Sequence, residues 1–334
     1  IIATVMGIAT SIGLGIMQIG GGLNHLFDVP NNNSTKILIT ILMVAIFLGS
    51  SLTGLNHGVK WLSNFNIILG AVLLIFILVF GDLKFILESY TLAISDYLQH
   101  FIEYSLRVNP YSGDDSWIQQ WTVFYWAWVI SWSPFIGGFV ARVSRGRTIR
   151  EFVVGVLIIP PLISFTWIAG FGGTAIKLAL NHNDKLVHIV DKDYTVALFE
   201  LLSHFPLSEV TSSLAIVLIF IFIVTSADST THIVAGMATG GAINPSLKHK
   251  VLWGLLIGAI SVAMTIAGGL KSLQTASVIT GLPFSIILLL MIFSLMRALK
   301  REPIHHFKMT SIDDEKDYSI SLEEREKQDE QENQ

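Results

Sequence analysis

The sequence predicts an all-α protein that crosses a membrane several times, and three observations lead to this fold class. Hydrophobic residues make up 52% of the 334 positions, charged residues make up only 14%, and the mean hydropathy is +0.62. Soluble domains average about 25% charged residues. About eight stretches carry almost no charge, and each approaches the roughly 20 residues that cross a bilayer as a helix.

The expected spans follow one another along the chain at residues 1–24, 37–56, 61–81, 118–141, 155–176, 210–227, 251–270 and 272–296. The first span has no polar segment or start methionine before it. We therefore expect an N-terminally truncated fragment whose first residues are not a signal peptide. From about Met309 acidic residues replace hydrophobic ones, which predicts a disordered tail over residues 301–334.

Basic residues in the short loops predict the orientation. Arg142, Arg145, Arg147 and Arg150 follow the fourth expected span, and the positive-inside rule places their loop in the cytoplasm. Alternation from there puts the C-terminal tail inside and residues 83–117 outside. In that outer segment, apolar residues at helical spacing alternate with acidic ones, which predicts an amphipathic helix on the outer membrane interface.

Composition excludes several function classes. The chain has no cysteine, so disulfides, thiolate catalysis and cysteine metal sites are ruled out. Its histidines show no metal-binding spacing, and no nucleophile–base pair falls at membrane depth. No basic patch with interleaved aromatic residues suggests nucleic acid. We expect neither an enzyme, nor a bound cofactor, nor a nucleic-acid partner.

Aromatic residues gather on the fourth expected span, where five of the eight tryptophans fall within residues 117–132. At helical spacing one face carries Trp121, Tyr125, Trp128, Trp132, Phe135 and Phe139. Ring faces at membrane depth attract a cation that cannot accept hydrogen bonds. The alternative is that these rings pack other helices or anchor an interface. Ser133-Pro134 and Gly137-Gly138 add a predicted kink or break, of the kind that forms midplane sites in carriers.

A second polar group interrupts the otherwise apolar span at 210–227. Thr225 and Ser226 supply hydroxyl oxygens that suit a hard cation such as sodium, and Asp228 is an ionisable side chain near membrane depth. The alternative is that the hydroxyls bond back to carbonyls of their own helix. Thr4, in the glycine-rich first span, is expected at a similar depth to Thr225. The glycines around it favour close helix packing.

Several of these motifs together resemble one transporter family. The string FYWAWVISWSPF at 124–135, followed by ARVSRGRTIREF at 141–152, closely resembles the signature of the betaine/choline/carnitine transporter family. Further matches are GGTAI at 172–176, TSADS at 225–229, GLPFS at 281–285 and the glycine-rich opening segment. The arginine-rich part is highly specific, and the matches cover nearly all of residues 1–300 in order.

The resemblance implies part of a ten-helix, inverted-repeat (LeuT-like) core. Residues 1–82 would hold the last three helices of the first repeat, 83–117 the external helix and loop, 118–300 the second five-helix repeat, and 301–334 the acidic cytoplasmic tail. It also suggests a homotrimer, multi-pass in the cell membrane and surrounded by the lipid bilayer.

Carried over residue by residue, the resemblance assigns Trp128 and Trp132 to the substrate region, and Phe135 and Phe139 to the inward pathway; the aromatic face adds Tyr125. Phe222, Thr225 and Ser226 match a sodium-site stretch, and Thr4 matches a threonine of a second sodium site. The chain departs from the family pattern twice. Val129 replaces the second ring of a tryptophan pair, and Ile8 replaces a second threonine.

The expected function is secondary active import of a quaternary-ammonium compound of the glycine betaine, choline or carnitine type, for osmoprotection. We expect sodium as the coupling ion, because Thr225-Ser226 is intact and residues 4–11 contain no lysine or arginine. One alternative is a proton-coupled choline carrier with Asp228 as relay. Another, suggested by Val129 and the acidic tail, is a membrane sensor that binds the same ligands without transport.

Overall fold

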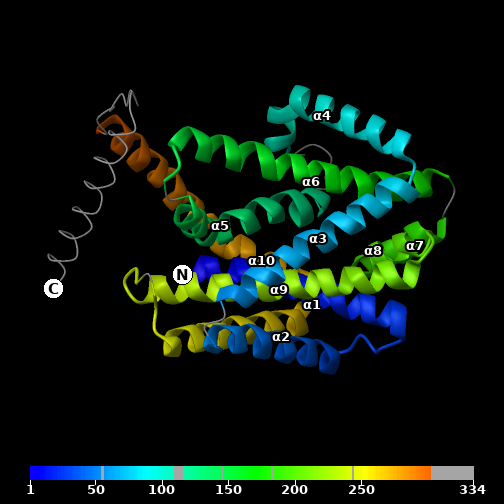
Figure 1. Ribbon diagram of the computed structural model, residues 1–334. Helices are drawn as coiled ribbons and strands as arrows, with labels where there is room; N and C mark the ends of the chain where they lie inside the picture. Colours follow the sequence, from blue (N-terminus) through cyan, green and yellow to red (C-terminus); the bar gives the residue numbers. More distant parts are fainter. Residues whose placement is uncertain (54–55, 109–115, 145, 182–183, 243, 302–334) are drawn as a thin grey trace, which may run out of the picture. The chain divides into compact units, whose positions relative to one another are not determined.

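The computed structural model describes residues 1–53, 56–108, 116–144, 146–181, 184–242 and 244–301. Within these residues every regular element is helical, which confirms the predicted all-α class (Figure 1). The helices are α1 (Ile2–Phe27), α2 (Asn33–Thr53), α3 (Asn56–Phe80), α4 (Leu83–Ser105), α5 (Phe124–Val143), α6 (Ile149–Leu180), α7 (Asp184–Lys192), α8 (Ala197–Leu202), α9 (Ser208–Ala238) and α10 (Leu247–Arg301). A π-helix, η1 (Ile118–Val123), leads into α5, and a 3-10 turn, η2 (Tyr194–Val196), precedes α8.

Seven of the described helices are long and apolar enough to cross a membrane, where the sequence predicted about eight spans. The difference lies in α10, whose 55 residues contain both of the last two predicted spans. Its backbone leaves helical geometry between them at Gly269, with φ 55° and ψ −133°. Glycine reaches this conformation because it has no Cβ. The chain forms two compact units, 1–285 and 286–334, and the described part of the second is the end of α10.

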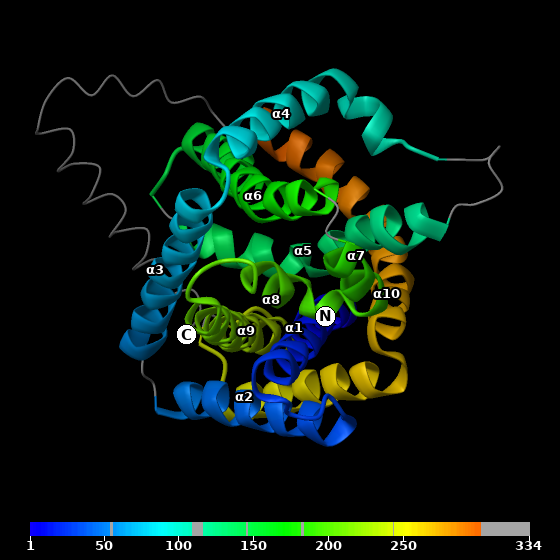
Figure 2. The ribbon, with the colours of Figure 1, turned by 90° about the vertical axis from the view of Figure 1, so that its right-hand side faces the viewer.

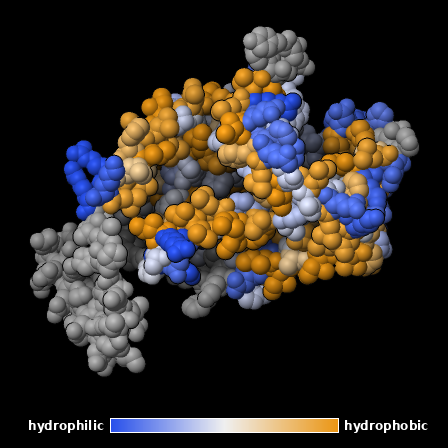
Figure 3. All heavy atoms as spheres, turned by 90° about the horizontal axis from the view of Figure 1, so that it is seen from above, coloured by the Kyte–Doolittle hydropathy of each residue, from blue (hydrophilic) through white to orange (hydrophobic). Residues whose placement is uncertain are grey.

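Exposed side chains are mostly apolar, as a surface surrounded by lipid requires (Figure 3). The expected tail over 302–334, Arg145 of the basic loop, and residues 109–115 of the outer segment lie outside the described residues.

Helix α1 is the most buried of the seven spans, with 61% of its most apolar window inside the fold. It packs against α2, α5 and α9, and Figure 2 shows it beside α9 and next to α2. The shared core contains Ile8 and Ile12 from α1, Phe47 from α2, Phe135 from α5 and Val224 from α9. A second core, centred on Phe199 and Leu202 of α8, joins α3, α6 and α9.

Glycines on α1 and α10 let both helices reach the backbone of α5. A Cβ built on Gly7 of α1 would lie 2.7 Å from the backbone nitrogen of Trp132 and 2.9 Å from its Cβ. A Cβ built on Gly281 of α10 would lie 2.7 Å from the carbonyl oxygen of Ala127. Real Cβ atoms do not approach other atoms this closely, so each contact requires glycine. The predicted role of the α1 glycines in close packing is therefore confirmed at Gly7.

Helix α5 runs without a break from Phe124 to Val143, so the predicted unwinding near Ser133-Pro134 is wrong. Pro134 lacks an N–H and leaves the carbonyl of Ile130 without its helical donor. The Ser133 hydroxyl donates to that carbonyl at 2.7 Å and replaces the lost hydrogen bond. The irregular backbone lies immediately before α5, in the π-helix η1. π-Helical turns of this kind are frequent at functional sites.

Helix α4 forms where the sequence placed an amphipathic helix, but it runs alongside α6, a candidate membrane span, and Tyr97 of α4 meets Phe165 of α6. This differs from the expected position flat on the outer membrane interface. The Asp82 carboxylate accepts the Phe85 backbone N–H at 3.0 Å and so caps α4. The same carboxylate pairs with Lys177 near the end of α6, and the Lys177 ammonium lies 5.3 Å from the centre of the Phe85 ring. These contacts hold the start of α4 against the end of α6.

Helix α6 begins with a capping box. The Glu151 N–H donates to the Thr148 hydroxyl at 3.2 Å, and the Thr148 N–H donates to the Glu151 carboxylate at 3.0 Å.

The close contact at Gly7 predicts a stability effect. We expect Gly7→Ala to destabilise the fold by about 1–3 kcal/mol, because an added Cβ must push α1 away from the α5 backbone. Gly155→Ala on α6 is the matched control, since a Cβ at Gly155 meets no atom within 4 Å and alanine favours the helix. Thermal unfolding of both purified variants in detergent tests this; equal melting temperatures for the two would contradict it.

Candidate functional site

The predicted aromatic face lies on α5, and Trp128 is its most firmly held member. The Trp128 indole N–H donates to the carbonyl oxygen of Gly7 and to the hydroxyl of Ser11, both at 3.1 Å. Its ring stacks on Phe124, with centroids 5.7 Å apart and planes 3° from parallel. Tyr125 meets the same ring edge-on at 5.6 Å. Trp128 is therefore oriented by the protein itself, with α1 taking its polar atom.

Trp132, one turn later, has no comparable polar contact. Its backbone lies against Gly7, and its side chain packs on the core shared by α1, α5 and α9. The Nε1 atom is buried and has no hydrogen-bond partner among the described residues. Buried N–H groups are nearly always paired, so an orphan one requires an explanation. An acceptor on a bound ligand is one group that would satisfy it.

The remaining members of the face form two groups, one on each side of Trp132 along α5. Tyr125 is half exposed and contacts Trp121, whose ring lies 6.4 Å from Tyr194 in the segment before α8. Phe135 is buried in the shared core, and the more exposed Phe139 lies 6.2 Å from it. The predicted face is thus present, with Trp132 between the two groups.

Tyr194 fits the role of a structural residue beside Trp121. Burial, helped by the nearby Asp193 carboxylate, raises the pKa of Tyr194 to about 12. Its hydroxyl therefore stays protonated and neutral across the physiological range.

A set of buried hydroxyls beside the aromatic face of α5 was not predicted from the sequence. The Ser131 hydroxyl donates to the carbonyl oxygen of Ser277 at 3.1 Å and lies 3.3 Å from the Thr280 hydroxyl. The Ser277 and Thr10 hydroxyls are 2.9 Å apart. These contacts join α1, α5 and α10. The available signal was the small residues Ser277 and Gly281 four apart on α10, a spacing typical of closely packed membrane helices.

The ion-site candidates on α9 are present, but their hydroxyls are engaged locally. Thr225 donates to the carbonyl oxygens of Ile221 and Phe222, at 3.0 and 3.1 Å. This is the back-bonded alternative that the sequence left open. The hydroxyl oxygen keeps lone pairs that can still face a cation. Ser226 is partly buried, whereas the side chain of Phe222 is 61% exposed.

Thr4 differs from Thr225 in both environment and level. It is fully buried, and its Oγ1 has no hydrogen-bond partner among the described residues. Gly15 of α1 packs on Ile223 of α9, and the two helices run in opposite directions (Figure 1). Thr4 precedes Gly15 by about 16 Å along α1, and it therefore lies toward the C-terminal end of α9. Thr225 is only two residues from Ile223 and lies close to the contact between Gly15 and Ile223. The expectation of a shared depth is therefore wrong, and the two threonines are separate candidate positions.

Comparison with known proteins agrees with these features. Residues 1–304 match the family of betaine/carnitine/choline transporters. The chain is 50% identical over 301 residues to the ectoine/hydroxyectoine transporter of Virgibacillus pantothenticus, covering 90% of this chain and 60% of that protein. It is 43% identical over 303 residues to the glycine betaine transporter OpuD of Bacillus subtilis, covering 90% and 59%.

A choline carrier is also similar. The osmo-independent choline transporter BetT1 of Acinetobacter baylyi is 37% identical over 308 residues, covering 90% of this chain and 59% of that protein. The chain thus spans about three fifths of the length of these relatives. The match over residues 1–304 and the aromatic face of α5 agree with the resemblance seen in the sequence. The chain is a multi-pass membrane protein that belongs to the betaine/carnitine/choline family of transporters, not to a family of enzymes.

Proposed function

We propose that the full-length protein is a secondary carrier that imports zwitterionic or cationic compatible solutes, with glycine betaine as the preferred substrate type. The observation that carries the proposal is Trp132, which combines a ring in the aromatic face with a buried indole N–H that has no partner among the described residues. A trimethylammonium group suits the ring face, and a carboxylate suits the free donor. Glycine betaine carries both groups.

Ectoine is a second candidate substrate, and Val129 is the observation that favours it. The resemblance expects a second ring at this position, and Val129 is about half exposed on α5. Ectoine is a cyclic amidinium carboxylate without a trimethylammonium group, so it depends less on a complete aromatic enclosure. A transporter named for ectoine and hydroxyectoine is also 50% identical to this chain.

Sodium is the proposed coupling ion, bound at Thr225 and Ser226. These residues provide oxygen ligands on a helix that packs directly against α1. The buried hydroxyl of Thr4 supports a second polar position on α1, separate from the first. The remaining features implied by the resemblance stay part of the proposal: the ten-helix inverted-repeat core, the division at residues 82, 117 and 300, the cytoplasmic C-terminus and the homotrimer.

Loss of the ring at Trp132 should weaken substrate binding. In the full-length carrier we expect Trp132→Leu to raise the KM for glycine betaine uptake about tenfold, the loss expected when one desolvated cation–ring contact disappears. Trp132→Phe keeps a ring and removes the donor, so its effect isolates the indole N–H. The matched control is Trp126→Leu on the same helix, because Trp126 is 55% exposed and outside the aromatic face. Unchanged kinetics in Trp132→Leu would refute the site.

Restoring the second ring tests the choice between betaine and ectoine. We expect Val129→Trp to raise the ratio of glycine betaine to ectoine uptake by about fivefold or more, because an added ring contributes on the order of 1 kcal/mol to a trimethylammonium group. Competition of the two unlabelled solutes against radiolabelled glycine betaine in proteoliposomes measures the ratio. A ratio that stays the same or falls would exclude Val129 from the substrate wall.

Replacing Thr225 tests the sodium site. We expect Thr225→Val to raise the sodium concentration for half-maximal uptake about tenfold, because the variant loses one oxygen ligand. Thr166→Val is the control, since Thr166 on α6 makes the same back-bond to its own helix, to Leu162 at 2.8 Å. Uptake into sodium-free proteoliposomes under a proton gradient alone would instead establish proton coupling. Ligand binding without any accumulation would indicate a sensor.

A further inference from the structure

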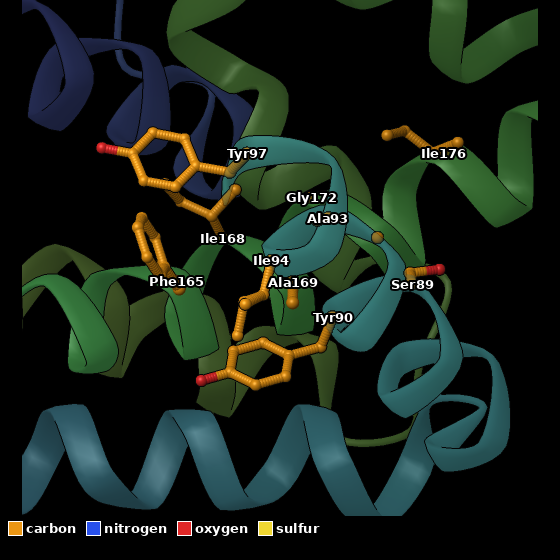
Figure 4. A pocket seen from close by; sticks show the side chains of 11 residues that line it. Ser89, Tyr90, Ala93, Ile94, Tyr97, Phe165, Ile168, Ala169, Gly172 and Ile176 are labelled. Atoms are coloured by element: carbon orange, nitrogen blue, oxygen red, sulfur yellow. The ribbon is translucent and has the colours of Figure 1, made fainter. Parts of the chain in front are cut away.

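A hollow between α4 and α6 lies apart from the aromatic face. It has a volume of about 320 Å³, within the range of small-ligand pockets. One face of α4 supplies Tyr90, Ala93 and Tyr97, and one face of α6 supplies Phe165, Ala169 and Gly173. In Figure 4 the rings of Tyr97 and Phe165 lie side by side on one side of the hollow, with Ser89 on the opposite side.

Glycine at position 173 is not explained by helix packing. Gly170, three residues earlier, fits closely against α3, since its built Cβ would lie 3.3 Å from both Ile77 and Leu74. Gly173 is also buried, yet a Cβ there would meet no atom within 4 Å. Glycine weakens a helix relative to alanine, so a glycine that serves no close contact leaves space at a cost to the helix. The space it leaves is the hollow.

The hollow extends to membrane depth. Asp82 pairs with Lys177 at the end of α6, and Tyr97 contacts Phe165 edge-on at 5.5 Å, so α4 runs antiparallel to the second half of α6. Phe165 lies roughly 18 Å along the α6 axis from Lys177. Helix α6 is a candidate membrane span, and none of its most apolar window is buried in the fold. The hollow therefore begins near a charged pair and continues beside a helix that faces lipid.

The chemistry of the walls restricts the occupant. No charged side chain lines the hollow, and its polar groups are the hydroxyls of Ser89, Tyr90 and Tyr97. A charged or strongly polar ligand would lose its hydration here without a compensating partner. The acyl chains of bilayer phospholipids are the apolar groups that are present at this depth in quantity.

We propose that the hollow between α4 and α6 binds one acyl chain of a bilayer phospholipid, with Gly173 providing the space and Tyr97 and Phe165 forming its deep side. The bound chain fills the gap between the two helices and stabilises α4 against α6. The site is independent of the substrate and of the coupling ion.

Filling the hollow with a side chain tests the proposal in the full-length carrier. Gly173→Leu should occupy the space, and Gly155→Leu on the same helix is the matched control, because its built Cβ also meets no atom within 4 Å but lies outside the hollow. Delipidated protein in detergent is titrated with dioleoylphosphatidylcholine and, separately, with dioleoylphosphatidylglycerol. We expect the melting temperature of wild type and Gly155→Leu to rise by a few degrees with either lipid. Gly173→Leu should start higher than wild type and respond to neither.

Other outcomes identify other occupants. An equal lipid response in Gly173→Leu and wild type overturns the proposal. So does a shift with glycine betaine that Gly173→Leu abolishes, which would make the rings a second cation site. A change of oligomeric state in Gly173→Leu, measured by light scattering, would assign the hollow to a second copy of the chain. If Gly173→Leu does not fold, Ala93→Leu fills the same space from α4 and is subject to the same criteria.

Discussion

Helices α1 and α10 both lie directly against the backbone of α5, and the rest of the structure depends on this constraint. Gly7 of α1 and Gly281 of α10 both lie where a Cβ would collide with α5 main-chain atoms. In a membrane, helix association relies on such close packing and on interhelical hydrogen bonds, because lipid is as apolar as the side chains. The hydroxyls of Thr10, Ser131 and Ser277 add those hydrogen bonds at the same level. Helices α1, α5 and this part of α10 are therefore held as one packed group.

This packing determines which tryptophan is free to bind. The contact at Gly7 brings its carbonyl oxygen and the Ser11 hydroxyl within reach of Trp128, whose N–H they accept. The same contact places Trp132 beside α1 with its N–H unpartnered among the described residues. The two tryptophans, four residues apart, therefore differ: Trp128 links α5 to α1 by hydrogen bonds, and Trp132 is the candidate ligand contact. The Ser133 hydroxyl keeps α5 helical across Pro134, so the face that carries both rings remains continuous.

Small residues on these helices serve two opposite purposes. At Gly7, Gly170 and Gly281 they permit close contact with a neighbouring helix, whereas Gly173 faces empty space in the α4–α6 hollow. Both kinds occur on α6 within a single turn of helix. Helix α4 is held by polar contacts at Asp82 and Lys177 and by ring contacts at Tyr97, with unfilled volume between them. Its packing is therefore looser than that of the α1–α5–α10 group.

The sequence by itself determined the all-α membrane class, the order of the spans and the family, because charge-free runs and the 124–152 signature are local properties. It also located the aromatic face, since ring spacing on one helix needs no partner. It missed the hydroxyl contacts from Ser131 to Ser277 and misplaced Thr4 relative to Thr225. It also allowed a kink or a break at Pro134, and the break does not occur. The first two points depend on how helices distant in the sequence are aligned. The third depends on which carbonyl accepts the hydrogen bond of the Ser133 hydroxyl. Only the tertiary structure decided these points, because helix register and the space beside a glycine are set by the neighbouring helix.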